Sequence, residues 1–203
     1  MSQTASAQTR SAWAYPLSQA VHGISGIRRI HGIYRIRGIR RIRGAAVSQA
    51  AGALPRRTKV CDDRYPGVAN LSPDLLKALR AAATDAAKDG VEFYVNSGWR
   101  SPEYQSQLLR RAVSKYGSYQ EAARWVATAE TSPHVWGDAV DIGSFDAVAW
   151  LSRHGAEYGL CQIYRNEPWH YELRPRAIDH GPPPMYADPT HDPRMSAAAR
   201  GGV

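Results

Sequence analysis

The segment SPHVWGDAVD, residues 132–141, carries an imidazole and a carboxylate, His134 and Asp141, around a glycine turn. Residues 139–142 (AVDI) predict a short strand, and the Ser-Pro-His stretch before them predicts a loop that enters it. A histidine and an aspartate at this spacing occur in many surface loops, so the pair alone is a weak indication of a metal site.

Two further segments supply the side chains that such a site would need. Residues 167–172 read EPWHYE, and residues 97–101 read SGWRS. His170 lies in another predicted strand, so only the fold could bring it to His134 and Asp141. Two imidazoles and one carboxylate form a donor set that zinc accepts, and three protein ligands leave a fourth position for water. The segments together therefore predict a zinc site.

Charged residues in two of these segments, EPWHYE and SGWRS, have the chemistry of a hydrolase. Glu167 precedes His170 by three residues, and its carboxylate could take a proton from a water whose pKa zinc lowers to about 7. The guanidinium of Arg100 suits an oxygen that becomes an oxyanion, or a terminal carboxylate. Glu172 is the alternative base. Because it shares a strand face with His170, we interpret it as the group that orients this histidine.

The remaining pattern indicates an α+β domain. A helix is expected from Ser72-Pro73, an N-cap followed by proline at the first helical position, to the stop at Gly90. Further helices are expected over 102–115, 118–127 and 145–154, and strands over 91–96, 139–142, 162–164 and 169–173. Helices before, between and after a few short strands are typical of the α+β class.

The three segments resemble the signatures of the VanY-like zinc D-alanyl-D-alanine carboxypeptidases. In that family they read S-G-Y/W-R-S, S-x-H-x-x-G-x-A-x-D and E-x-W-H, in the order found here, and no signature position is substituted. The resemblance covers roughly residues 61–175. The same superfamily includes vancomycin-resistance D,D-dipeptidases and phage L-alanyl-D-glutamate endopeptidases.

This resemblance implies a fold and a set of catalytic roles. The fold would be a small antiparallel sheet that carries the zinc site and is flanked by helices, as in D-alanyl-D-alanine carboxypeptidases and hedgehog-like domains. His134, Asp141 and His170 would bind Zn²⁺. Glu167 would be the general base, and Arg100 would stabilise the polarised carbonyl.

The implied substrate is a peptidoglycan stem peptide that ends in D-Ala-D-Ala and loses its terminal D-alanine. Ser132 and Gln105 would contact the terminal part of this peptide. The alternatives are a related endopeptidase or D,D-dipeptidase with the same zinc core, and a non-catalytic binder of wall peptides. The ligands do not separate the enzymes, because the walls of the cleft set substrate length. A monomer is expected, and no specific nucleic acid.

The N-terminal part differs sharply in composition. Residues 24–44 repeat the six-residue pattern I-x-G-I-x-R, in which Ile recurs every three positions, a spacing that fits neither a helix nor a strand. Residues 1–61 hold 11 Lys or Arg and no Asp or Glu, whereas residues 62–203 hold 15 and 18. We therefore expect residues 1–60 to be a disordered basic tail and linker, which could bind anionic polymers or a membrane surface. The zinc peptidase domain is expected over 61–186, and a flexible extension over 187–203.

Two cysteines and the absence of long apolar runs bear on location. Cys61 and Cys161 are either joined by one disulfide or are two unrelated buried thiols. No apolar run approaches the roughly 18 residues of a transmembrane helix, and no signal-peptide core is readable. A location in the cell envelope or outside the cell is expected from the substrate alone.

Overall fold

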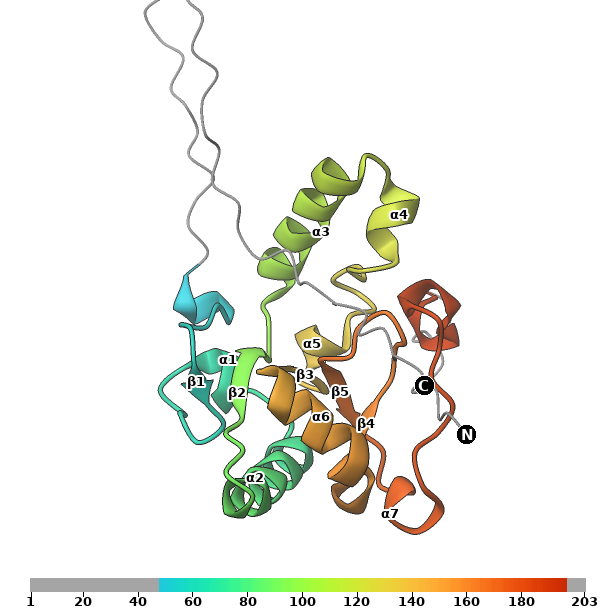
Figure 1. Ribbon diagram of the computed structural model, residues 1–203. Helices are drawn as coiled ribbons and strands as arrows, with labels where there is room; N and C mark the ends of the chain where they lie inside the picture. Colours follow the sequence, from blue (N-terminus) through green and yellow to red (C-terminus); the bar gives the residue numbers. More distant parts are fainter. Residues whose placement is uncertain (1–47, 197–203) are drawn as a thin grey trace, which may run out of the picture. The chain divides into compact units, whose positions relative to one another are not determined.

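A computed structural model of the chain describes residues 48–196, so the repeat at 24–44 and most of the expected tail lie outside the described residues (Figure 1). The strands of the described part are β1 (Thr58–Lys59), β2 (Tyr94–Ser97), β3 (Ala139–Gly143), β4 (Leu160–Gln162) and β5 (His170–Leu173). Its α-helices are α1 (Pro66–Ala69), α2 (Pro73–Lys88), α3 (Pro102–Tyr116), α4 (Tyr119–Ala123), α5 (Pro133–Trp136), α6 (Phe145–His154) and α7 (Ala177–His180). Its 3₁₀ helices are η1 (Gln49–Ala51), η2 (Gly155–Tyr158), η3 (Pro189–His191) and η4 (Pro193–Met195).

The strands form one antiparallel sheet in the order β1-β2-β3-β5-β4. Asp141 of β3 pairs with His170 of β5, so two of the predicted ligands are cross-strand neighbours. On its other side Asp141 pairs with Ser97 of β2. The expected α+β fold with a small antiparallel sheet is confirmed.

A β-bulge in β2 brings the SGWRS segment to the same face of the sheet as Asp141. Val95 pairs with Ile142, and Ser97 pairs with Asp141, so two steps along β2 correspond to one along β3. Paired residues of antiparallel strands point to the same face. The extra residue therefore lets Val95 stay on the face of Ile142 while Ser97 joins Asp141.

The opposite face of the sheet is the hydrophobic core. Val140, Ile142 and Tyr171 are buried in one cluster with the apolar side of α2, where Leu75 and Leu79 are inaccessible to solvent. Helices α2 and α6 contact each other and the strands β4, β5 and β3 (Figure 1). Because side chains alternate along a strand, the core fixes β3 and β5 from one face and leaves the other for the site.

The folded domain extends beyond the expected limits of 61 and 186. At the N-terminal side, Thr58 of β1 pairs with Val95, and both Thr58 and Val60 are buried. At the other side, residues 187–196, which we call the C-terminal strap, bury Asp188 and Asp192. These polar groups are satisfied by ion pairs and hydrogen bonds, so the strap packs closely although its composition is typical of a frayed end.

Several local expectations differ from the structure. The strands expected over 91–96 and 162–164 are β2 (Tyr94–Ser97) and β4 (Leu160–Gln162). The helix expected over 118–127 ends at Ala123. His134 lies in the short helix α5 and not in a loop, because Pro133 begins a helical turn there. The disulfide is not formed: Cys61 is an exposed free thiol, and Cys161 is a buried one in β4.

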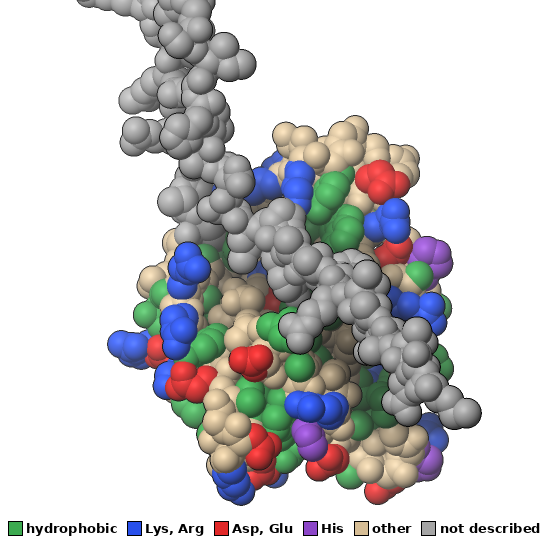
Figure 2. Space-filling model, in the orientation of Figure 1, with side chains coloured by type: hydrophobic (Ala, Val, Ile, Leu, Met, Phe, Trp, Pro, Cys, Tyr) green, Lys and Arg blue, Asp and Glu red, His purple; other side chains and the backbone are tan. Residues whose placement is uncertain are grey.

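The surface of the described part is mixed in charge. Figure 2 shows Lys and Arg side chains among Asp and Glu on the visible face. None of the described helices is both long and apolar enough to span a bilayer.

Candidate metal centre

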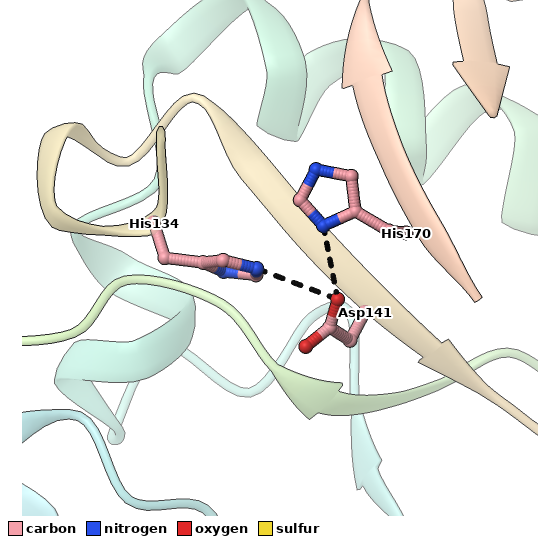
Figure 3. Close-up of side chains that lie close together, drawn as sticks. All are labelled: His134, Asp141 and His170. Carbon is pink, nitrogen blue, oxygen red and sulfur yellow. Dashed lines mark hydrogen bonds and ion pairs between the residues drawn. The ribbon is translucent and has the colours of Figure 1, made fainter. Parts of the chain in front are cut away.

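Three buried donor groups converge on the face of the sheet opposite the core. Figure 3 shows His134, Asp141 and His170 pointing toward one another from α5, β3 and β5. His134 Nε2 lies 3.4 Å from Asp141 Oδ1, and His170 Nδ1 lies 3.3 Å from the same oxygen. One ligand atom from each residue lies within 4.8 Å of the others, and all three residues are buried. Across residues 48–196, this is the group of metal-ligating side chains close enough to hold an ion.

The ring of His134 is held in one tautomer by the backbone. Its Nδ1 lies 2.8 Å from the carbonyl oxygen of Gly98, which can only accept a hydrogen bond. Nδ1 therefore carries the hydrogen, and the lone pair of Nε2 faces Asp141. Gly137 ends α5 with a φ of 78°, and a Cβ there would lie 2.4 Å from the carbonyl oxygen of Asn70. Only glycine fits this turn, which brings the chain from His134 into β3.

His170 is oriented in the complementary way. Its Nε2 lies 3.2 Å from Oε1 of Glu172, an oxygen that only accepts, so Nε2 carries a hydrogen and Nδ1 is the nitrogen that faces Asp141. Glu172 is buried, and both of its oxygens have partners, His170 on Oε1 and the arginines Arg174 and Arg194 on Oε2. This geometry agrees with the interpretation of Glu172 as the group that orients the histidine.

Arg100 fixes the carboxylate of Asp141. Its Nη2 donates to Asp141 Oδ2 over 2.7 Å, which leaves Oδ1 toward the two histidines. Its Nε donates to Ser97 Oγ over 2.7 Å and its Nη1 to Gln105 Oε1 over 3.1 Å. Gln105 in turn donates to the carbonyl oxygen of Ala127. The guanidinium is thus held on three sides, and its contact with a substrate carbonyl stays a prediction.

Glu167 lies beside the cluster and not in solvent. Its Oε2 is 3.7 Å from Nδ1 of His170, the nitrogen that faces Asp141. Burial raises the pKa of Glu167 to about 7, against the opposing charges of His170 and Arg100. A carboxyl group with a pKa near neutrality can both accept and return a proton under ordinary conditions.

The charges of the cluster suit a cation. Burial, with the neighbouring charge of Arg100, lowers the pKa of His134, so this ring is neutral. Burial would raise the pKa of Asp141, but His134, His170 and Arg100 hold it well below its usual range. Burial would lower the pKa of His170, but its hydrogen bonds with Asp141 and Glu172 raise it to about 10, so this ring is protonated without an ion and gives up its Nδ1 proton when a metal binds. The site then offers an ionised carboxylate between two imidazoles, which is a nitrogen and oxygen donor set that zinc accepts.

The two residues predicted to contact substrate are both buried. Gln105 and Ser132 are each 1% exposed. The Gln105 amide accepts a hydrogen bond from Arg100 and donates one to the carbonyl oxygen of Ala127, so it holds Arg100 in place, and its contact with substrate stays a prediction. Ser132 directly precedes α5, and its contact with substrate stays a prediction.

A family model and a known relative match the part of the chain that carries the site. A family model described as VanY, D-alanyl-D-alanine carboxypeptidase, matches residues 68–176. That range contains the three metal-ligating residues together with Glu167 and Arg100. A D-alanyl-D-alanine carboxypeptidase of Enterococcus faecalis is 33% identical over 113 residues, and the match covers 43% of this chain and 42% of that protein. The chain thus spans less than half the length of this relative.

Two solved structures are similar to this chain. VanYB in complex with D-alanine-D-alanine is 26% identical with a TM-score of 0.50, over 55% of this chain and 74% of the other. The zinc(II) complex of a vancomycin-resistance D,D-pentapeptidase, VanY, is 27% identical with a TM-score of 0.48, over 51% of this chain and 72% of the other.

Proposed function

The chain belongs to the VanY family of D-alanyl-D-alanine carboxypeptidases, and from this premise we propose that it removes the terminal D-alanine from peptidoglycan stem peptides with the help of zinc. The observation that carries the proposal is the convergence of His134, Asp141 and His170, with the buried carboxylate of Glu167 beside them. The enzyme would act where stem peptides lie, in the cell envelope or outside the cell.

The donor set fits zinc in chemistry and in orientation. His134 Nε2, His170 Nδ1 and the carboxylate of Asp141 would hold the ion, since the other nitrogen of each ring is occupied by Gly98 or Glu172. Bound there, zinc supplies Lewis acidity, which lowers the pKa of a water to about 7 and polarises the carbonyl of the scissile bond.

The chain's own residues would move the proton and hold the geometry. Glu167 accepts the proton of the attacking water on its carboxylate and returns it to the nitrogen of the departing D-alanine, as the peptide C–N bond breaks. Arg100 keeps Asp141 fixed through its 2.7 Å hydrogen bond. Its guanidinium has five N–H donors, so donors beyond those used by Ser97, Gln105 and Asp141 can approach the substrate carbonyl.

Removal of a single D-alanine is favoured over the other cleavages by the relatives. The family is described by D-alanyl-D-alanine carboxypeptidase activity, and VanYB was solved with D-alanine-D-alanine. An endopeptidase or D,D-dipeptidase would use the same ligands and the same base. The site residues therefore do not distinguish the three reactions, but the masses of their products do.

Mass spectrometry of a stem pentapeptide after incubation with the zinc-loaded full chain tests the proposal. We expect the loss of one alanine. The loss of two alanines, or an internal cut, would support one of the alternative reactions instead.

Glu167→Gln should retain zinc and reduce kcat by about 10²–10⁴-fold, because it removes the proton carrier. Glu103→Gln, an exposed carboxylate in α3, is the matched control and should leave turnover unchanged. Wild-type turnover in Glu167→Gln would remove this residue from its role.

A further inference from the structure

We propose that Arg194, in the C-terminal strap, is a positioning residue of the metal centre, which acts on His170 through the carboxylate of Glu172. This inference rests on the proposed zinc site and deepens it. Arg194 lies beyond the family match, which ends at residue 176. The strap would thus complete the centre from outside the segment that defines the family.

The guanidinium of Arg194 contacts both carboxylate oxygens of Glu172. Its Nη1 donates to Oε2 over 2.7 Å, and its Nη2 lies 3.3 Å from Oε1, the oxygen that accepts the hydrogen bond of His170. Arg174 adds one contact, to Oε2 over 2.6 Å. Of these two arginines, Arg194 alone contacts the oxygen that orients the histidine. A planar guanidinium that spans a carboxylate fixes its rotation as well as its position.

Asp192 holds Arg194 in turn and closes a ring of contacts. Its Oδ1 accepts hydrogen bonds from the backbone nitrogen and from Nε of Arg194, both over 3.0 Å. Its Oδ2 accepts the hydroxyl of Tyr164 over 3.0 Å, and the Tyr164 ring packs on His170 with 5.0 Å between centroids. His170 is therefore held from two sides, by Glu172 and by Tyr164, and the strap joins both.

The strap is anchored independently at its other end. Oδ2 of Asp188 accepts a hydrogen bond from Nε of Arg124, next to α4, over 3.0 Å. Oδ1 of Asp188 accepts one from the backbone nitrogen of Thr190 over 2.9 Å, which caps η3. Because this anchor does not involve Arg194, the loss of the Arg194 side chain should leave the strap in place.

Loss of Arg194 would leave the buried Glu172 with one arginine partner, Arg174. Arg174 donates only to Oε2 of Glu172, so Oε1, the oxygen that faces His170, would have no arginine contact. A carboxylate that is free to turn no longer fixes the ring and tautomer of His170, and such outer partners typically change metal affinity or activity by about 10–100-fold. Lysine would keep the charge but cannot contact both oxygens of Glu172 and Asp192 at once.

Zinc affinity of the full chain, measured by competition with a chromogenic chelator, tests this role without any substrate. Arg194→Ala should bind zinc about 10-fold more weakly than wild type, and Arg194→Lys should fall between them. The absorption spectrum of the cobalt(II)-substituted protein should change with Arg194→Ala, because the orientation of a ligand changes. Arg176→Ala, which removes an exposed arginine, is the matched control and should change neither quantity.

A double-mutant cycle separates positioning from general stabilisation. If Arg194 acts through Glu172, then adding Arg194→Ala to the Glu172→Gln variant should lower its zinc affinity by less than about 2-fold. Wild-type affinity and an unchanged cobalt spectrum in Arg194→Ala, or losses that add in the double variant, would overturn the inference. A wild-type chain that binds zinc but cuts no stem peptide would refute the proposed function, and the affinities would still decide the role of Arg194. A wild-type chain that binds no zinc would refute both.

Discussion

Three glycines let backbone segments from different elements touch beside the metal centre. A Cβ on Gly98 would lie 2.0 Å from the carbonyl oxygen of Gly67, and one on Gly67 would lie 2.7 Å from that of Gly52. A Cβ on Gly52 would lie 2.1 Å from the carbonyl oxygen of Trp99. These contacts place the carbonyl of Gly98 against Nδ1 of His134. The signature glycine therefore serves a metal ligand through packing of the main chain.

Gly98→Ala should disturb both the fold and the metal site. Because the added methyl group meets backbone that cannot rotate away, we expect a loss of about 1–3 kcal/mol in the free energy of unfolding. The displaced carbonyl should also weaken zinc binding, as a lost outer partner does. Denaturant unfolding and chelator competition measure the two effects.

Gly90→Ala is the control for this substitution. Gly90 has a φ of 75°, but nothing lies within 4 Å of a Cβ built there. It should cost only the backbone strain of a left-handed residue, about 1–2 kcal/mol, and leave zinc affinity unchanged. Equal zinc affinity in wild type and Gly98→Ala would show that the Gly98 carbonyl does not set the orientation of His134.

The side chains of the centre could be predicted from the sequence to the extent that their chemistry is local. His134, Asp141, His170 and Glu167 stand in short segments whose residue types match zinc and a proton carrier. Arg194 follows Glu172 by 22 residues in a Pro- and Asp-rich stretch, and no periodicity relates the two. The contacts of Gln105 with Arg100 and with Ala127 could not be predicted from the sequence, because only the fold brings these residues together.

The C-terminal strap owes part of its stability to the ionised form of Asp188. Burial opposes ionisation, but hydrogen bonds from Thr190, His191 and Arg124 lower the pKa of Asp188 to about 2 from its ordinary value of 3.8. A carboxylate with a lowered pKa contributes its full stability above its ordinary pKa and loses it as the pH falls through the lowered one. The contribution of Asp188 should therefore be complete above about pH 4 and vanish toward pH 2.

Asp188→Asn should reduce the free energy of unfolding by about 1–2 kcal/mol at pH 7, somewhat less than the full shift implies because Arg124 and His191 are screened by solvent. Wild type and variant should converge in stability as the pH is lowered from about 4 toward 2. Denaturant unfolding at several pH values measures this difference. A constant gap between the two proteins across that range would show that ionisation of Asp188 does not stabilise the strap.

The longer elements follow their sequence patterns, and the short ones do not. Helix α2 runs between the expected proline and glycine because its apolar face spans four turns. Strand β1 has two residues, next to a basic cluster, and gains its place only by pairing with β2. Helix α5 is a single turn, set by Pro133 and Gly137. Elements of this length hold too few residues for a period to be read.

The domain as a whole is built from residues 48–196 as far as the structure describes it, and all the contacts of the metal centre given above lie within that range. Residues 1–47 hold eight Arg and no Asp, Glu or Lys. Their charge therefore belongs to a part of the chain that supplies no described ligand, proton carrier or positioning group. Any binding of anionic polymers by this part should be separable from the hydrolysis.

Two truncations should separate these roles. Deletion of residues 1–47 should leave zinc affinity and the rate of stem-peptide hydrolysis unchanged. Deletion of residues 1–60 also removes β1, the buried Val60 and the contact of Gly52 with Trp99. Burial of one valine alone stabilises by about 1.5–3 kcal/mol, so the longer deletion should lower the free energy of unfolding by at least this amount and weaken zinc binding. Denaturant unfolding and chelator competition on both truncated proteins measure these effects.

Two outcomes would contradict the prediction. If the longer deletion behaves like the shorter one, the domain does not need the edge strand. If the shorter deletion abolishes hydrolysis, residues 1–47 take part in the chemistry.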